Sequence, residues 1–191
     1  MTTLSRLAAV GLCVVSAVNA ASAAELNVGD PAPKFTVKDD AGKDWKSADH
    51  VGKKVVVVYF YPADFTGGCT KQACGFRDDL DELSKQGIEV VGVSADSVDT
   101  HAEFKKYHKL NFTLLADEDT KLAEAFGVEV VPGEKVAKAE IDGKEKSFVR
   151  KATIKRWTFL IGKDGKIAAV DKMVNAAEDS KKILKLAKEL K

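Results

Sequence analysis

Apolar runs alternate along the chain with segments in which apolar residues recur at helical spacing. Residues 55–61 form a continuous β-branched and aromatic run, and residues 88–93 form a second apolar run. Such runs are typical of strands that are buried on both faces of a parallel sheet. Between them Phe76, Leu80 and Leu83 follow a helical period. The pattern therefore predicts a βαβ unit, with two parallel strands joined by a crossover helix.

The rest of the chain continues this alternation. Helices are predicted at residues 98–108, 120–126 and 178–190, and short strands at 112–115 and on both sides of the turn at 39–42. Residues 157–161 and 166–170 read as two strands of a hairpin. Strands that alternate with helices indicate an α/β fold, with a central mixed sheet flanked by helices.

Residues 129–152 show no clean period. Charged residues crowd around Pro132, Gly133 and Gly143, and we interpret the segment as a long mobile loop. An undetected strand or helix is the alternative, because loops of this length are uncommon inside compact domains.

The N-terminus has the pattern of an export signal. Arg6 supplies a positive start, residues 7–18 form a short apolar core, and residues 21–23 are small, as at a cleavage site. A retained membrane anchor is the alternative, but the apolar core is shorter than the ~20 residues that a spanning helix needs. We predict a signal peptide at residues 1–23, a single domain at residues 24–191, and a periplasmic or otherwise exported location.

Cleavage changes both the cysteine count and the charge. Cys13 is one of three cysteines and leaves with the signal, so Cys69 and Cys74 remain. Removal of Arg6 from the 30 basic residues leaves 29, which balance the 29 acidic ones. This balance indicates neither a nucleic-acid partner nor a membrane partner. The remaining domain is also large enough to fold without a disulfide.

Cys69 follows the first buried strand and is predicted to lie in the first turn of the helix. Unpaired backbone N–H groups and the helix dipole favour a thiolate at that position. Gly67 and Gly68 carry no side chains, so a small substrate can approach the backbone closely. The segment is therefore a candidate thiol active site.

The spacing of the two cysteines favours a switch over a structural bridge. Five residues along an ideal helix leave the Cα atoms of Cys69 and Cys74 roughly 8 to 9 Å apart, on different faces. A disulfide needs them within about 7 Å. Oxidation would then have to unwind the intervening turn, and Gly75 weakens the helix there.

These residues carry a family resemblance. Pro62, Thr66 and Cys69 match the Pro-x-x-x-Thr-x-x-Cys signature of peroxiredoxins, and the four residues between Cys69 and Cys74 resemble the PrxQ or bacterioferritin-comigratory (BCP) branch. Two further regions are similar to the family's opening segment and to its late arginine strand and hairpin: residues 28–35, and residues 156–161 with 164–167. Two features depart from the branch: Gly67 replaces a frequent proline, and residues 130–155 are longer than usual.

The resemblance implies a thioredoxin-like fold and a thiol-dependent peroxidase that reduces hydrogen peroxide and organic hydroperoxides. It implies that Cys69 is the peroxidatic cysteine and Cys74 the resolving one, joined in an intramolecular disulfide on turnover. An exported, thioredoxin-like dithiol protein would reduce that disulfide. We expect no cofactor and no metal, and a monomer or weak dimer.

Three further residues take roles in this scheme. The Thr66 hydroxyl would point toward the thiolate and the peroxide, and Pro62 would fix the loop and shield it from water. Arg156 would supply the cation that stabilises the thiolate and the charge that moves onto the peroxide oxygens.

Two other interpretations stay open. The cysteine pair could be a purely structural disulfide. A thioredoxin-like copper-binding chaperone would instead combine thiolates with histidine, and the chain has His50, His101 and His108. His101 and His108 lie seven residues apart on one predicted helical face, which we expect to lie at the surface.

Overall fold

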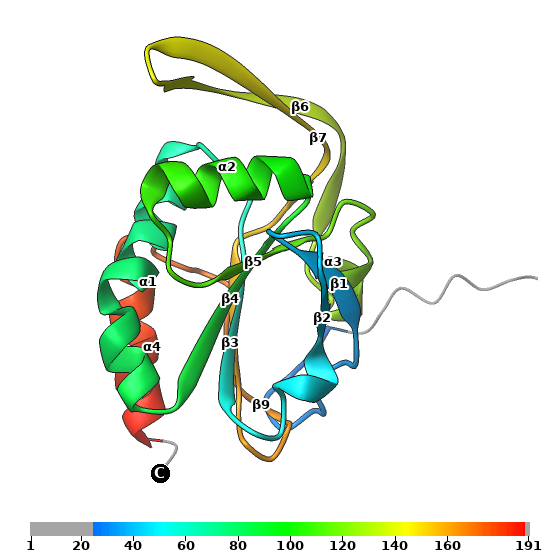
Figure 1. Ribbon diagram of the computed structural model, residues 1–191. Helices are drawn as coiled ribbons and strands as arrows, with labels where there is room; N and C mark the ends of the chain where they lie inside the picture. The colour runs from blue at the N-terminus through cyan, green and yellow to red at the C-terminus, as the bar shows by residue number, and fades with distance from the viewer. Residues whose placement is uncertain (1–24, 190–191) are drawn as a thin grey trace, which may run out of the picture.

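A seven-stranded mixed sheet forms the centre of the protein (Figure 1). The computed structural model describes residues 25–189, so the predicted signal peptide at residues 1–23 lies outside the described residues. The strands run in the order β2-β1-β5-β4-β3-β8-β9. Their bounds are β1 (Thr36–Asp39), β2 (Asp44–Lys46), β3 (Val55–Phe60), β4 (Ile88–Ser94), β5 (Thr113–Ala116), β8 (Trp157–Ile161) and β9 (Ile167–Asp171).

Helices cover both faces of this sheet. They are α1 (Gly67–Lys85), α2 (Val98–His108), α3 (Lys121–Ala125) and α4 (Asp179–Glu189), with a short 3-10 turn, η1 (Ser47–Asp49). The predicted α/β fold, a central mixed sheet flanked by helices, is confirmed. Within residues 25–189, no helix combines the length and the apolar character needed to cross a membrane.

Alternate residues of β3 point into two separate cores. Val57 and Tyr59 pack with buried residues of α1, α2 and α4, whereas Val56, Val58 and Phe60 pack with α3 and Trp45. These five of the six β3 side chains are fully buried, which explains why the strand is apolar on both faces.

The predicted βαβ unit is present. β3 and β4 are parallel neighbours joined by α1, and β8 pairs antiparallel with the other edge of β3. The predicted strand pair and hairpin form as β1–β2 and β8–β9, each within a residue or two of the expected bounds. The carboxyl end of β3 thus enters α1 beside the start of β8, and the candidate site residues Cys69 and Arg156 lie at this junction.

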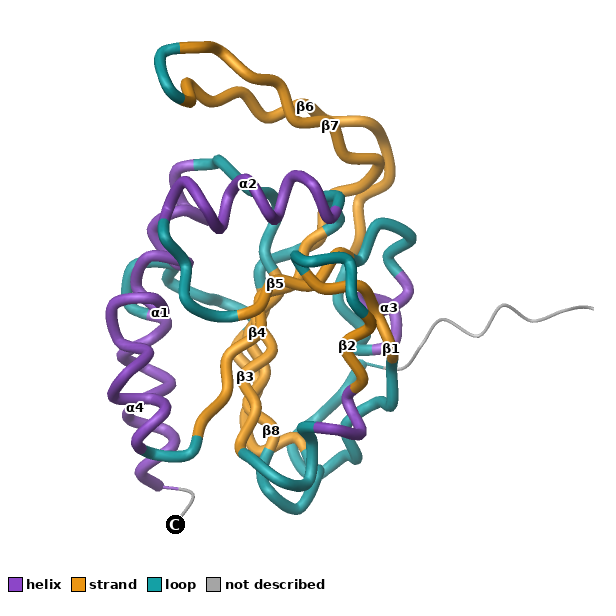
Figure 2. The backbone as a smooth tube through the Cα atoms, viewed as in Figure 1, coloured by secondary structure: helices purple, strands orange, loops and turns teal. Residues whose placement is uncertain are grey.

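Residues 129–152 are not a loop. They form most of a long antiparallel hairpin, β6 (Val130–Ile141) and β7 (Lys144–Ile154), which is a separate two-stranded sheet. Figure 2 shows it extending away from the central sheet and past α2. The expectation of a mobile loop is wrong because most positions of both strands are exposed, so no apolar alternation appears in the sequence.

The turn of this hairpin did leave a signal in the sequence. Asp142 and Gly143 join β6 to β7 with backbone φ angles of 52° and 75°. Asp-Gly is a strongly preferred pair for a two-residue hairpin turn with left-handed backbone. Turn chemistry, not the pattern of apolar residues, was therefore the evidence for this element.

Candidate active site

Residues 61–66, called here the active loop, connect β3 to α1. Thr66 has extended backbone and is the N-cap of α1, which places Cys69 in the first turn of the helix, as the sequence predicts. Cys69 is buried, with 1% of its surface exposed. The Thr66 hydroxyl donates to the Ala63 carbonyl at 3.0 Å, a bond within the active loop. The predicted role of Thr66 toward the sulfur stays a prediction.

Arg156 lies directly against the sulfur. Its Nη2 donates to Cys69 Sγ at 3.1 Å, and its Nη1 donates to the side-chain oxygen of Gln72. Gly68 leaves room for the guanidinium, since a Cβ there would lie 3.4 Å from Arg156 Nη2. Arg156 precedes β8, the antiparallel partner of β3, so the pairing of these strands brings it to the start of α1.

Gln72 links Arg156 to Asp179, the first residue of α4. Its amide nitrogen donates to Asp179 Oδ2 at 2.6 Å, and the Thr158 hydroxyl donates to the same oxygen at 2.7 Å. Burial raises the pKa of Asp179, and the two hydrogen bonds act in the opposite direction. The chain Asp179–Gln72–Arg156 therefore fixes the guanidinium that contacts Cys69.

The sequence interpretation missed Gln72. The only signal was its position three residues after Cys69, which puts both side chains on one face of α1. Asp179 had no signal of its own, because it reaches the site only when α4 packs against α1.

Cys74 lies on the same continuous helix as Cys69, and both thiols are free. The geometry of an α-helix then keeps their Cα atoms roughly 8 to 9 Å apart, so a bridge requires the turn between them to unwind. Burial raises the pKa of the Cys74 thiol; Arg77 opposes this shift and Asp78 adds to it. Gly75 lies under α4, since a Cβ there would be 3.3 Å from Ser180 Oγ.

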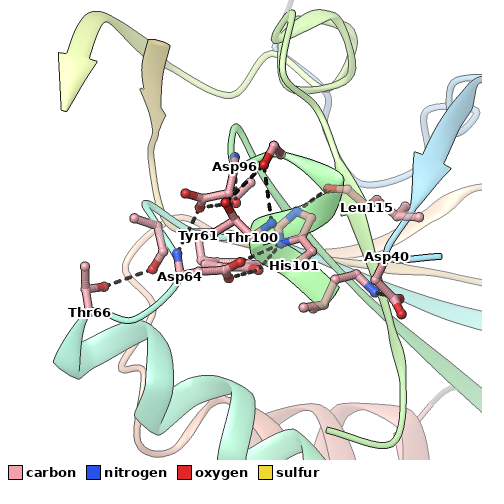
Figure 3. A network of polar contacts seen from close by, with 12 residues as sticks. Asp40, Tyr61, Asp64, Thr66, Asp96, Thr100, His101 and Leu115 are labelled. Atoms are coloured by element: carbon pink, nitrogen blue, oxygen red, sulfur yellow. Dashed lines mark hydrogen bonds and ion pairs between the residues drawn. The ribbon is translucent and has the colours of Figure 1, made fainter. Parts of the chain in front are cut away.

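A fully buried polar network lies beneath the active loop (Figure 3). The Asp64 carboxylate accepts a hydrogen bond from the Tyr61 hydroxyl at 2.7 Å and pairs with His101 Nδ1 at 2.7 Å. The backbone N–H of Asp64 donates to Asp96 Oδ2 at 2.9 Å. The network therefore ties the loop to α2 and to the residues that follow β4.

The expectation that His101 lies at the surface is wrong. His101 is fully buried, and its Nε2 lies 3.2 Å from the Leu115 carbonyl of β5. The face of α2 that carries it also carries Phe104, which is buried, and it packs on the sheet. His108, one turn beyond Phe104, is half-buried.

The surroundings of the buried histidine favour its charged form. Burial alone would lower the pKa of His101, but the Asp64 charge and hydrogen bond, with a further contribution from Asp96, outweigh it and raise that pKa. Burial and the Asp64 charge raise the pKa of Asp96. The contact with His101 thus anchors Asp64, two residues before Thr66.

Phe65 adopts an unusual backbone conformation within the active loop. Its φ is 56°, in the left-handed region, which costs a non-glycine residue about 1–2 kcal/mol. Its ring stacks on Phe148 of β7, with centroids 4.3 Å apart and planes 12° apart, and meets Phe104 of α2 edge-on at 5.1 Å. The β6–β7 hairpin therefore touches the active loop directly.

Of the predicted site residues, Arg156 contacts the Cys69 sulfur. Pro62 and Thr66 lie in the loop that leads to Cys69, and Cys74 lies further along α1, so their roles stay predictions. Among residues 25–189, no cluster of three His, Cys, Asp or Glu side chains could hold a metal ion. His101, the histidine of the buried network, is already paired with Asp64. Nothing in this arrangement favours the copper-chaperone interpretation.

Comparisons with known proteins agree on one family. The model of the AhpC/TSA family matches residues 28–170. "Putative peroxiredoxin bcp" of Coxiella burnetii is 46% identical over 145 residues, which cover 76% of this chain and 87% of that protein. "Peroxiredoxin Bcp" of Escherichia coli is 44% identical over 147 residues, covering 76% and 85% respectively.

Solved structures agree with the sequence relatives. Peroxidoxin BcpB of Mycobacterium tuberculosis superposes with a TM-score of 0.72 at 29% identity, covering 87% of this chain and 99% of that one. Peroxiredoxin Q of Xanthomonas campestris gives a TM-score of 0.66 at 30% identity, covering 81% and 90%. The predicted thioredoxin-like fold is confirmed by these neighbours.

The buried pair generates a pH-dependent prediction. Replacing His101 with Asn leaves Asp64 buried without its partner, which should lower the free energy of unfolding by about 3–5 kcal/mol. The pKa of His101 is raised from 6.5. The excess unfolding free energy of the wild-type protein over the variant should therefore be complete below pH 6.5 and should shrink as pH rises through the raised pKa. Urea unfolding of both proteins across pH 5 to 9 measures this.

His108→Asn is the matched control on the same helical face. Burial, followed by the Arg77 charge, lowers the pKa of His108. Its contribution should therefore be lost as pH falls, giving the opposite slope. If the difference in unfolding free energy between the wild-type protein and His101→Asn grew with pH, a charged His101 would be contradicted.

Proposed function

We propose that this chain, which belongs to the AhpC/TSA family and is a peroxiredoxin, is an exported two-cysteine enzyme of the PrxQ/BCP type. A peroxiredoxin is a peroxidase that acts with a thiol. Its substrates in this proposal are hydrogen peroxide and organic hydroperoxides. Cys69 is the peroxidatic cysteine, Cys74 is the resolving cysteine, and the enzyme works as a monomer or weak dimer. The contact between Arg156 and the Cys69 sulfur is the single observation that carries the assignment.

In the first step the Cys69 thiolate attacks one oxygen of the peroxide. The O–O bond breaks, a sulfenic acid forms on Cys69, and the leaving oxygen takes a proton and departs as water or alcohol. Negative charge moves from sulfur onto the peroxide oxygens. The Arg156 guanidinium stabilises both ends of this movement because its position is preset by Gln72. Pro62 and Thr66 shape the loop that borders the sulfur.

In the second step the Cys74 thiol attacks the sulfenic sulfur. The S–O bond of the sulfenic acid breaks, its oxygen leaves as water, and a disulfide forms between Cys69 and Cys74 with the bonding electron pair from the Cys74 sulfur. Each of the two thiols has then given one of the two electrons that reduced the peroxide. The raised pKa of Cys74 keeps it a protonated thiol at neutral pH. Because both residues belong to α1, the first turns of the helix must unwind before the sulfurs can meet. An external dithiol then reduces the disulfide by thiol exchange.

The proposal of export rests on residues 1–23, which carry the basic start, short apolar core and small-residue site of a signal peptide. An exported enzyme does not meet cytosolic reductants, so its partner in this proposal is an exported thioredoxin-like dithiol protein. The chemistry needs no cofactor, because thiols supply every electron.

The cysteine roles predict two different variant phenotypes. With one equivalent of peroxide, the wild-type protein should lose two hydrogens in mass spectrometry and form the Cys69–Cys74 disulfide. Cys69→Ser should stop peroxide consumption, whereas Cys74→Ser should consume one equivalent and retain a trappable sulfenic acid or mixed disulfide on Cys69. Undiminished turnover by Cys69→Ser would refute the assignment.

The Arg156 contact predicts a slower first step. Arg156→Gln should reduce the rate constant for peroxide reaction with reduced enzyme by about 10²-fold, the usual effect of removing one preset donor from a developing charge. Stopped-flow kinetics of the reduced protein measure it. Lys155→Gln is the control, since Lys155 is exposed and pairs only with Glu129 on the surface. Equal rates for the two variants would exclude a direct role for Arg156.

The proposed export predicts a processed protein. Expressed at full length in a Gram-negative host, the protein should appear in the periplasmic fraction with a mass that begins at residue 24. A variant without residues 2–23 should stay in the cytoplasm with unchanged peroxidase activity. Recovery of the unprocessed full-length chain in the cytoplasm would contradict the proposal.

A further inference from the structure

The β6–β7 hairpin has one face turned toward the active loop and one face turned to solvent. Ala137, Ile141 and Phe148 form a small buried cluster, against which Phe65 of the loop packs. On the opposite face Val136 and Val149, a directly paired couple, are 52% and 51% exposed. The outer part of the hairpin passes over α2 (Figure 1), and its apolar face packs against the active loop.

One stack and one ion pair join the outer part of the hairpin to the active loop and to α2. The ring of Phe148 stacks on the ring of Phe65, with centroids 4.3 Å apart. Lys146, two residues earlier on β7, pairs with Glu103 of α2. The first contact is made to the active loop itself, and the second to the helix that supplies His101 and Phe104 beneath it.

Phe65 also belongs to the environment of the reactive thiol. It packs against the core cluster that contains Cys69 as well as against the hairpin cluster. It stands between Asp64, which the buried ion pair anchors, and Thr66, which begins α1. Its left-handed backbone persists only if neighbouring groups hold it, and such strained positions gather at active sites.

The Asp64 side chain has polar neighbours, and the Phe65 ring has aromatic ones. Asp64 is held by hydrogen bonds to His101, Tyr61 and Asp96. These three residues are not among the rings that stack on Phe65 in the contacts given above. The Phe65 ring lies against Phe148 of the hairpin and against the rings of Phe104, Tyr107 and His108 of α2. Phe148 is the ring that the β6–β7 hairpin supplies, so the hairpin contacts the loop directly.

We propose that Phe148 is a positioning residue that acts through Phe65 to hold the active loop in the conformation that reacts with peroxide. The proposal rests on the two-step function above. The loop must be held for the Cys69 thiolate to be converted to sulfenic acid, and the start of α1 must be released for the sulfenic acid to condense with the Cys74 thiol and expel water. The Phe65–Phe148 stack therefore favours the first step and opposes the second.

The proposal predicts opposite changes in the rates of sulfenic acid formation and disulfide formation. In Phe148→Ala the rate of sulfenic acid formation should fall about three- to tenfold, within the coupling that an aromatic pair provides. The rate of disulfide formation should rise by a similar factor. Quenched-flow mass spectrometry on the reduced, full-length mature protein resolves both steps, with sulfenic acid trapped by a carbon nucleophile.

Three companion variants separate positioning from general damage to the fold. Phe148→Tyr keeps the stacked ring and should restore both rates, whereas Phe148→Leu keeps apolar volume without the ring face and should resemble Phe148→Ala. Val149→Ala, the neighbouring residue on the exposed face, should leave both rates unchanged.

A double-mutant cycle tests whether Phe148 acts through Phe65. Adding Phe148→Ala to Phe65→Ala should change neither rate further. Additive effects would overturn the proposal, as would a fall of both rates together in the folded Phe148→Leu variant. Failure of the two-step function is distinguishable, because the wild-type protein itself would then form no disulfide.

Discussion

The contact between the Arg156 guanidinium and the Cys69 sulfur is the interaction around which the chemistry is arranged. A buried sulfur that must carry negative charge needs a permanent cation within hydrogen-bonding distance, because the surrounding core offers little solvation. Residue 156 reaches residue 69 only because β8 pairs beside β3, at the same end at which β3 enters α1. The guanidinium then keeps its orientation through Gln72 and the buried Asp179 of α4. The position of the guanidinium against the sulfur thus depends both on the order of the strands and on the packing of α4 against α1.

The active loop is restrained by two kinds of force. A buried ion pair and a short hydrogen-bond network hold the Asp64 side chain and backbone. Aromatic stacking holds Phe65 in a left-handed conformation. Buried ion pairs are rigid because separating them leaves an uncompensated charge, whereas a single aromatic stack is weak enough to open and close. This division suits the proposed two-step reaction, in which the first step needs a fixed loop and the second needs the adjoining helix to unwind.

How far the sequence predicts this protein differs from one element to the next. The β3–α1–β4 unit was predictable because its strands are apolar at every position and its helix has a clear period. Residues 129–152 were misread because a two-stranded hairpin exposed on most of its surface needs no apolar alternation, and only the Asp142-Gly143 turn marked it. His101 was misplaced because a polar residue on an amphipathic helix is ordinarily exposed, and its buried partner Asp64 lies 37 residues away.

By itself, the sequence determined the fold class, the place of Cys69 in the first turn of a helix, and the helical separation of the two cysteines. Each of these depends on interactions within a few residues along the chain, which leave a local pattern. Tertiary structure alone decided that Gln72 and Asp179 orient Arg156, that Asp64 pairs with His101, and that Phe148 stacks on Phe65. These contacts join residues far apart in the chain, and their geometry exists only once the strands have paired and the helices have packed.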